Sequence, residues 1–462
     1  MQFLALRRWA DLDEAERARL LARSTAAIFD PALMTSIEAI FADVRERGDA
    51  AVIDATERFD GVRLTADRLA VTATEIDRAH ATTPPALLAG IREAIANSRL
   101  FNEAQLRATT TAWQQEVRPG FILGERFAPI PSVGLFVPTG KASYPSVLCQ
   151  IGTPAVVAGV AEITVVVPPI PGSLGGAADS TMPVGSVDPA TLAVARELGI
   201  TRVFRANGPA GIAALTFGTA TVPRVIKIVG PGSPAVTAAQ VLAQRYGTAT
   251  QMLCGPSESL LIADDSADPW RLAIDLLNEA EHGADSAATL VTDSQALAEA
   301  VDAAVARQIG DLPEVRRAAA TAVLSDLGGV ILVGSMDEAV AFANVYAAEH
   351  VQIATRDPEA TLEALCYAGE ALLGQDTPIG ASSYTIGIPA TLPTGGYARL
   401  NGGVTARTFL TSTSTARLSA EALAGLAEPT LALADHEGFP AHANAFRLRG
   451  LGGSAGDEKS RS

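Results

Sequence analysis

A carboxylate and an imidazole stand next to each other at Glu349 and His350, in the stretch AAEHVQI, at the start of a run typical of a short β-strand. Histidine is the side chain whose ordinary pKa lies near neutrality, so a neutral imidazole in a cleft can take the proton of an alcohol. The adjacent carboxylate can position a water molecule. A helix-terminal histidine beside a solvated glutamate explains the same two residues, and their spacing alone leaves both interpretations open.

A second combination of the same residue types occurs at Glu279 and His282, in NEAEHGADS. Helical periodicity precedes it, so two residues that are three apart lie on one face of the helix. With this spacing one helix can supply a carboxylate and an imidazole to a metal ion. An acidic turn at a helix end is the alternative. Glu437 and His442 stand far away in the sequence, so any part they take depends on the fold.

A glycine-containing turn follows a short apolar run in VIKIVGPGSPAVTAAQ, residues 225–240. Gly230, Gly232 and Ala235 loosely match the turn of dinucleotide-binding folds, in which backbone amides at a helix N-terminus hold a phosphate. Pro231 is unusual in that turn. An ordinary strand-to-helix connection explains the segment equally well.

The composition limits the class of protein that carries these residues. The chain has 462 residues, of which 48% are hydrophobic and 19% charged, so we expect a folded protein with more than one domain. A net charge of −16 argues against a general nucleic-acid or anionic-membrane surface. Three separated cysteines argue against a disulfide framework. The N-terminus has no signal-peptide pattern and no apolar run is long enough to cross a bilayer, so we expect a soluble cytoplasmic protein.

Short β-branched runs alternate with helical patterns along most of the chain. The helical patterns of the N-terminal part cover residues 12–59, 73–80 and 84–107. The first series of expected strands covers residues 132–138, 162–168, 203–206 and 225–232, and the second covers residues 259–264, 287–292, 329–334 and 350–355. This alternation predicts an α/β fold with two doubly wound parallel sheets and a cleft between them. Ligands of such sheets bind beyond the carboxyl ends of the strands. Residues 168–190 are expected to form a surface loop, and the tail 453–462 to be disordered.

Taken together, these motifs resemble histidinol dehydrogenase. The matching stretches, which follow in the order of that family, are SVGLFVP, GIAALTFGT, VPRVIKIVGPG, CGPSESLLIAD, EAEHGADS, AEHVQI, LPTGGYAR and EGFPAHANAFRLR. The match runs from about residue 5 to residue 449. It implies two Rossmann-like domains, a small N-terminal arm and a C-terminal segment exchanged in a homodimer. The expected division is an arm over 1–25, one domain from 26–125 with 257–395, a second domain over 126–256, and a C-terminal segment over 396–462.

The resemblance also implies NAD, one zinc ion per site and oxidation of an alcohol to a carboxylate in two hydride transfers. In that scheme His350 matches the base that takes the hydroxyl proton, and Glu349 matches the residue that activates water for the second step. The implied substrate contacts are Ser257, Glu279, His282, Ser383, Glu437 and His442, the last two from the C-terminal segment of the partner subunit. The implied cofactor contacts are Phe136, Ala210, Gly230, Gly232 and Ser233.

Several of these positions depart from the family pattern. The family's zinc ligands are Gln, His, Asp and His, where this chain has Glu279, His282, Ser383 and His442. One carboxylate and two imidazoles remain, and a His₂Glu set with an open position is a known catalytic zinc arrangement.

Other departures concern the substrate and the cofactor. A substrate-binding Asn-His pair is replaced by Pro389 and Ala390. On the cofactor side, Phe136 replaces Tyr, Ala210 replaces Gln and Ser233 replaces Asn.

The changes on the substrate side point to another substrate. A site that loses the groups that hydrogen-bond its substrate also loses discrimination for that substrate steeply. We therefore expect NAD-dependent oxidation of a small polyol or amino alcohol other than histidinol. Superfamily members that resemble dihydroxypropanesulfonate dehydrogenase set a precedent. Oxidation of histidinol itself is one alternative, and a catalytically silent binding protein with the same fold is another.

Overall fold

The computed structural model describes residues 3–23, 28–109, 112–139, 142–171 and 182–451. The expected disordered tail at 453–462 and much of the loop at 168–190 lie outside the described residues. The chain divides into two compact units. The first contains Met1–Ala104 and Pro129–Phe409, and the second contains Gln105–Ala128 and Leu410–Ser462.

A five-stranded parallel sheet lies in the first unit, with the order β6-β5-β4-β7-β8. Its strands are β4 (Ser132–Phe136), β5 (Glu162–Val167), β6 (Arg202–Arg205), β7 (Lys227–Val229) and β8 (Ala249–Thr250). The helices that connect them are α6 (Pro145–Ala158), α7 (Pro189–Glu197), α8 (Gly208–Phe217) and α9 (Pro234–Gln244). The chain winds outward from β4 in both directions, so the strand order reverses between β4 and β7.

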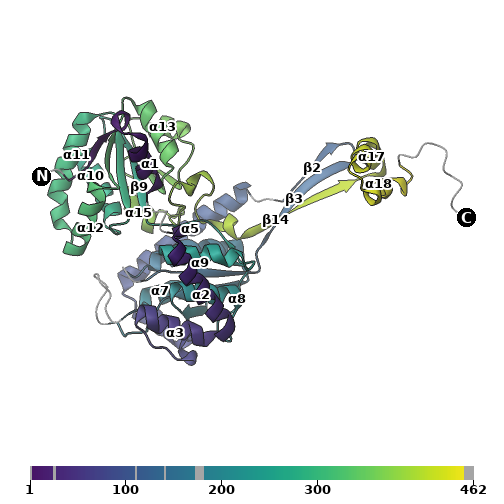
Figure 1. Ribbon diagram of the computed structural model, residues 1–462, viewed down its shortest axis with the longest axis horizontal. Coiled ribbons are helices and arrows are strands. Elements are labelled where there is room, and N and C mark those ends of the chain that lie inside the picture. Colours follow the sequence, from purple (N-terminus) through teal and green to yellow (C-terminus); the bar gives the residue numbers. More distant parts are fainter. Residues whose placement is uncertain (1–2, 24–27, 110–111, 140–141, 172–181, 452–462) are drawn as a thin grey trace, which may run out of the picture. The chain divides into compact units, whose positions relative to one another are not determined.

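A six-stranded parallel sheet in the same unit has the order β1-β11-β10-β9-β12-β13. Its strands are β1 (Leu6–Arg8), β9 (Glu258–Ala263), β10 (Ala287–Thr292), β11 (Gly329–Leu332), β12 (His350–Ala354) and β13 (Glu370–Leu373). Its helices are α10 (Pro269–Ala280), α11 (Gln295–Gln308), α12 (Glu314–Ser325), α13 (Met336–Tyr346), α14 (Pro358–Ala364) and α15 (Ile379–Tyr384). Its order reverses between β9 and β12. The predicted α/β fold with parallel sheets is confirmed (Figure 1).

The N-terminal helices pack differently from the division expected from the sequence. They are α1 (Glu14–Ala22), α2 (Pro31–Arg47), α3 (Asp49–Asp60), α4 (Ala73–Thr82) and α5 (Pro85–Thr109). The apolar stripe of α2, which includes Phe41, is buried in one core cluster with Leu215 of α8 and Ala239 of α9. Residues 31–60 therefore complete the core of the five-stranded sheet, whereas the sequence groups 26–125 with 257–395. The physical reason is that α8 is apolar on all sides, so the part of its surface that does not face the sheet is buried by packing against α2 and α3.

The second unit is a three-stranded sheet followed by short helices. Its strands β2 (Trp113–Arg118), β3 (Phe121–Pro129) and β14 (Leu410–Leu418) have the order β14-β3-β2, and β2 and β3 are antiparallel. The helices are α16 (Ala420–Gly425), α17 (Ala427–His436) and α18 (Pro440–Arg447). Figure 1 shows the three strands side by side, with α17 and α18 at one end. The unit combines residues 105–128 with the C-terminal segment, whereas the sequence assigns 105–125 to the first domain and 126–128 to the second.

The remaining short 3-10 helices are η1 (Trp9–Asp11), η3 (Ala66–Arg68), η4 (Ile309–Asp311), η5 (Tyr397–Arg399) and η6 (Ala406–Phe409). Among the described residues, none of the helices combines the length and the apolar character needed to cross a membrane. The expected cytoplasmic location stays a prediction.

Candidate active site

A cavity of about 350 Å³ in the first unit is lined by residues from the ends of both parallel sheets. Pro138 and Thr139 follow the carboxyl end of β4, and the turn 231–233 follows the carboxyl end of β7. These two strands flank the point where the order of the five-stranded sheet reverses. Rossmann-like folds bind dinucleotides at this point.

The six-stranded sheet contributes to the cavity through the opposite ends of its strands. Ser257 precedes β9, Glu349 precedes β12, and His350 is the first residue of β12. For this sheet the expectation of a site beyond the carboxyl ends is wrong. At the amino end of a parallel strand the first backbone amide is free to donate to a side chain, so this edge of the sheet can also hold a carboxylate. The amide of Glu258 donates in this way to the carboxylate of Glu349.

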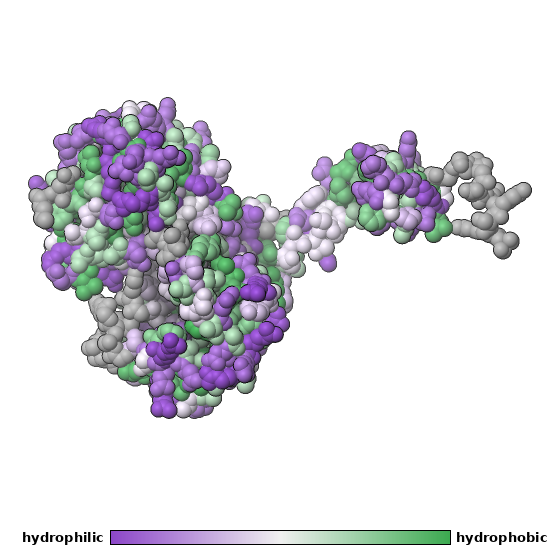
Figure 2. All heavy atoms as spheres, in the orientation of Figure 1, coloured by the Kyte–Doolittle hydropathy of each residue, from purple (hydrophilic) through white to green (hydrophobic). Residues whose placement is uncertain are grey.

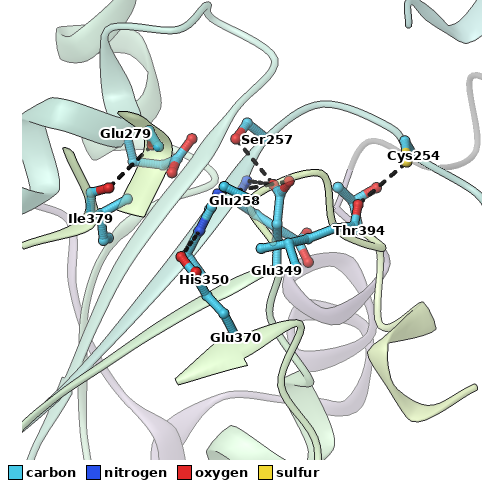
Figure 3. Close-up of polar contacts among 12 residues, drawn as sticks. Cys254, Ser257, Glu258, Glu279, Glu349, His350, Glu370, Ile379 and Thr394 are labelled. Atoms are coloured by element: carbon cyan, nitrogen blue, oxygen red, sulfur yellow. Dashed lines mark hydrogen bonds and ion pairs between the residues drawn. The ribbon is translucent and has the colours of Figure 1, made fainter. Parts of the chain in front are cut away.

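The Glu349 carboxylate is buried and held at one oxygen. Its Oε2 accepts hydrogen bonds from Ser257 Oγ at 3.0 Å and from the Glu258 amide at 2.9 Å (Figure 3). Burial raises the pKa of Glu349 above the ordinary value of a glutamate, and the neighbouring His350 opposes this rise. A tight backbone turn sets the position of the carboxylate, since Ala347 ends α13 in the left-handed region with φ 49°.

The His350 ring lies between two carboxylates. Its Nδ1 is 2.5 Å from Oε1 of Glu370, and its Nε2 is 3.8 Å from Oε1 of Glu349 (Figure 3). Burial alone would lower the pKa of His350, but the charges of Glu349 and Glu370 outweigh burial and raise it above the ordinary value. The sequence analysis assigned no role to Glu370 and no strand to EALL, whose residues are good helix formers. The glycines on both sides, Gly369 and Gly374, are the signal that could have marked it as a short strand.

Glu279 and His282 lie together at the C-terminal end of α10, as their spacing predicts. Glu279 is 0% exposed, and neither of its carboxylate oxygens has a hydrogen-bond partner among the described residues. Its Oε1 is 3.6 Å from Nδ1 of His282, which also lies 3.1 Å from the carbonyl of Asn278. If Nδ1 donates to that carbonyl, the Nε2 lone pair stays available to a metal ion. A buried carboxylate without a hydrogen-bond partner fits a cation, so the two side chains fit two positions of a zinc site.

The other two expected zinc ligands are placed differently. The hydroxyl of Ser383 lines the cavity and donates to the carbonyl of Ile379 at 3.1 Å. His442 lies on α18 of the second unit, and Glu437 follows α17. In the described part of the chain no three His, Cys, Asp or Glu side chains gather into a metal site. The four-ligand set therefore stays a prediction.

The wall that carries Ser383 and Ala390 is fixed by one side chain of α6. Gln150 donates from Nε2 to the carbonyl of Ser383 at 2.8 Å and accepts from the amide of Ala390 at 2.7 Å. Gln150 itself lines the cavity. These contacts use the backbone of both residues, so the side chains presented at this wall are a methyl group and a hydroxyl.

The expected cofactor residues divide into two groups. Gly232 and Ser233 line the cavity at the N-terminus of α9, where the Ser233 side chain makes no cap hydrogen bond. The side chains of Phe136 and Ala210 are buried in the core, at 1% and 0% exposure. Close packing accounts for Gly230, because a Cβ atom there would lie 2.1 Å from the carbonyl oxygen of Phe136. Gly232 lies in a similarly crowded turn. The turn stands at the start of α9, where the backbone amides of a helix N-terminus can hold a phosphate.

Comparison with known proteins identifies the family. Residues 24–450 match the sequence profile of histidinol dehydrogenase. The chain belongs to the histidinol dehydrogenase family. A histidinol dehydrogenase homolog from Colwellia psychrerythraea is 39% identical over 442 residues, which cover 95% of each chain. A histidinol dehydrogenase from Methanosarcina barkeri is 37% identical and covers 97% of this chain and 98% of the relative.

A solved structure supports the same assignment. Histidinol dehydrogenase from Elizabethkingia anophelis matches with a TM-score of 0.88 and 31% sequence identity, over 97% of this chain and 98% of that one. The resemblance that the motifs carry is thus confirmed. Membership of the histidinol dehydrogenase family makes the protein a dehydrogenase.

Proposed function

We propose that the chain oxidises a small polyol or amino alcohol with NAD, at the cavity that contains Glu349 and His350. One observation carries the proposal. The cavity joins the turn 231–233, at the order reversal of the five-stranded sheet, to a buried Glu–His pair at the edge of the six-stranded sheet. A dinucleotide bound along the turn would thereby lie next to groups that can move a proton.

The chemistry of the pair follows from its contacts. His350 can take the hydroxyl proton of the substrate at Nε2, since Nδ1 is engaged with Glu370. Bound NAD supplies the acceptor for the hydride that leaves the carbinol carbon. Glu349 is held through Oε2, so its Oε1 is left to orient a water molecule for a second oxidation. Zinc held by Glu279, His282 and His442 of a partner copy would polarise the alcohol.

The wall of the cavity supports a substrate other than histidinol. An imidazole and an amine need polar partners, and the side chains present at positions 390 and 383 are the methyl of Ala390 and a hydroxyl engaged with a carbonyl. A site that lacks such partners discriminates poorly in favour of the ligand that needs them. The named histidinol dehydrogenases among the relatives keep histidinol as the second candidate substrate.

A homodimer is part of the proposal, because the family resemblance implies that Glu437 and His442, which belong to the second unit, reach the site from the partner subunit. Both residues are exposed there, and so are the apolar side chains of Leu433 and Phe439, at 64% and 51%. Figure 2 shows hydrophobic residues among hydrophilic ones on this unit. A unit with few buried apolar residues of its own is stabilised when its apolar side chains pack against another chain.

The experiment is a screen of NAD reduction by the purified, zinc-loaded full chain. The panel contains histidinol, small diols, amino alcohols, and sulfonated and phosphorylated alcohols. We expect NADH formation with a small polyol or amino alcohol and little with histidinol. Turnover of histidinol at an enzyme-like rate would replace the proposed substrate by histidinol. If no alcohol is turned over and NAD does not bind, the result would favour the alternative that the chain is a catalytically silent binding protein.

A further inference from the structure

Glu370 and His350 face each other across neighbouring strands. In the parallel pairing of β12 with β13 the two residues are register partners, so their side chains lie on the same face of the sheet. Oε1 of Glu370 is 2.5 Å from Nδ1 of His350, and the two side chains are 3% and 6% exposed. A carboxylate and an imidazole in contact form a charge-assisted hydrogen bond.

The carboxylate of Glu370 is itself held at its second oxygen. Oε2 accepts a hydrogen bond from Ser382 Oγ at 2.5 Å, from the helix α15. The backbone is fixed as well, since the Glu370 amide donates to the carbonyl of Glu349 at 3.0 Å. A Cβ atom at Gly369 would lie 2.4 Å from that same carbonyl oxygen, so the two segments approach as closely as their backbones allow. Glu370 is therefore positioned by contacts on both oxygens and along the strand.

The consequence for His350 concerns its tautomer and its orientation. Glu370 accepts from Nδ1, so in the neutral ring Nδ1 carries the hydrogen and Nε2 carries the lone pair. Nε2 points to the side of the ring where Glu349 and the cavity lie. The titratable groups that face the ring are Glu349 before its own strand, Glu370 on β13 and Glu279 on α10. Glu258 on β9 faces Glu349 and forms an ion pair with Arg23 at 2.8 Å.

We propose that Glu370 is the positioning residue of this enzyme, which holds the His350 ring with Nε2 toward the substrate. The proposal rests on the proposed function, because it assigns His350 the role of base. Glu370 does not touch the substrate and acts through the imidazole. The proton of the alcohol goes to Nε2, and the hydrogen at Nδ1 stays on the ring.

The first test is kinetic and uses Glu370→Gln. When a catalytic histidine carries its proton on the wrong nitrogen, kcat falls by orders of magnitude. We therefore expect kcat of Glu370→Gln to fall by about 10²-fold or more. KM should change little, since Glu370 lies behind the ring. The base form of His350 exists above its pKa, and loss of the carboxylate lowers that pKa. The acid limb of the pH profile should therefore move to lower pH.

The matched control is Asp275→Asn, which removes another buried carboxylate next to the same sheet. Asp275 is 5% exposed, and its hydrogen-bond partner is Gln352, two residues beyond His350 on β12. Its pH profile should equal that of the wild type. Equal profiles and rates for wild type and Glu370→Gln would overturn the proposal. Ser382→Ala, which keeps the carboxylate and removes one anchor, should give a smaller loss of kcat and serves if Glu370→Gln does not fold.

The second test needs no substrate. In NMR spectra of protein labelled with ¹⁵N-histidine, His350 should show the Nδ1-protonated form with a strongly deshielded proton, lost in Glu370→Gln. An inactive wild type that shows this signal would refute the proposed function and leave the pair intact. If Nδ1 of the neutral His350 ring carries no hydrogen, the proposed hydrogen bond from His350 to Glu370 is refuted.

Discussion

Ser257 donates a hydrogen bond from its hydroxyl to Oε2 of Glu349 at 3.0 Å, and so fixes one end of the carboxylate while Oε1 faces His350. The two oxygens thus have separate contacts. One is bound by the segment before β9, and the other lies beside the imidazole. A carboxylate held in this way can orient water without rotating away from the histidine.

Glu349→Gln should therefore separate the two oxidation steps. Removal of the first proton needs His350, whereas hydration of the aldehyde needs the carboxylate beside the water. We expect the variant to release about one NADH per substrate where the wild type releases two, and Glu363→Gln on the exposed face of α14 to behave as the wild type. If the wild type itself stops after one NADH, the enzyme is a two-electron dehydrogenase and Glu349→Gln should be nearly silent. Equal slowing of both steps would contradict separate roles.

His282→Ala should remove most of the bound zinc. The proposed set would keep only Glu279 and the partner's His442, and two protein ligands are too few for a tetrahedral zinc site. Metal content by mass spectrometry after zinc loading measures the effect directly. His80→Ala is the control, since His80 pairs with Glu197 at 2.6 Å away from the cavity. Stoichiometric zinc in His282→Ala would exclude this site.

Asp275→Asn should stabilise the protein in a pH-dependent way. Burial raises the pKa of Asp275 to about 6, and the hydrogen bond with Gln352 opposes the rise. The folded state therefore binds this proton more tightly than the unfolded chain, so the native carboxylate costs stability once the pH exceeds the unfolded pKa. We expect a gain of about 1–3 kcal/mol near pH 7 that fades toward pH 4. Urea unfolding at both values measures it, and a gain that is the same at both would contradict the assignment.

The exposed leucine of α17 offers a test of the dimer. Light scattering of the full chain should give the mass of two copies, and Leu433→Glu should shift the mass toward one copy because it places a charge in an apolar contact. Leu362→Glu on α14 of the first unit is the control and should leave the mass unchanged. A monomeric wild type would refute the dimer.

The sequence predicted the central strands because their residues are β-branched and form short apolar runs. VGLF, TVVV and TLVT lie within β4, β5 and β10 as expected. Strands built from residues with other preferences were missed. EALL in β13 consists of good helix formers, and only its pairing with β12 makes it a strand. Glu370 could not be recognised for the same reason, since its role depends on a contact across the sheet.

The candidate site shows the same limit. Glu349, His350 and Ser257 were predicted from the family motifs, and the structure brings them to one cavity. Which sheet edge carries them could not be read from the strand pattern, since a parallel sheet has both a carboxyl and an amino edge. Likewise, the burial of Phe136 follows from packing against residues far away in the sequence. Long-range packing is the part of the fold that periodicity does not report.

His350→Ala tests the central claim, which is that His350, beside Glu349, takes the proton of an alcohol while NAD is reduced. The measurement is the initial rate of NADH formation with the best alcohol of the panel, in wild type, His350→Ala and His350→Gln. Folding is checked by circular dichroism, and NAD affinity by titration. The account predicts a loss of about 10²-fold or more in kcat, with NAD affinity little changed. An active wild type whose rate is the same in both variants would contradict it.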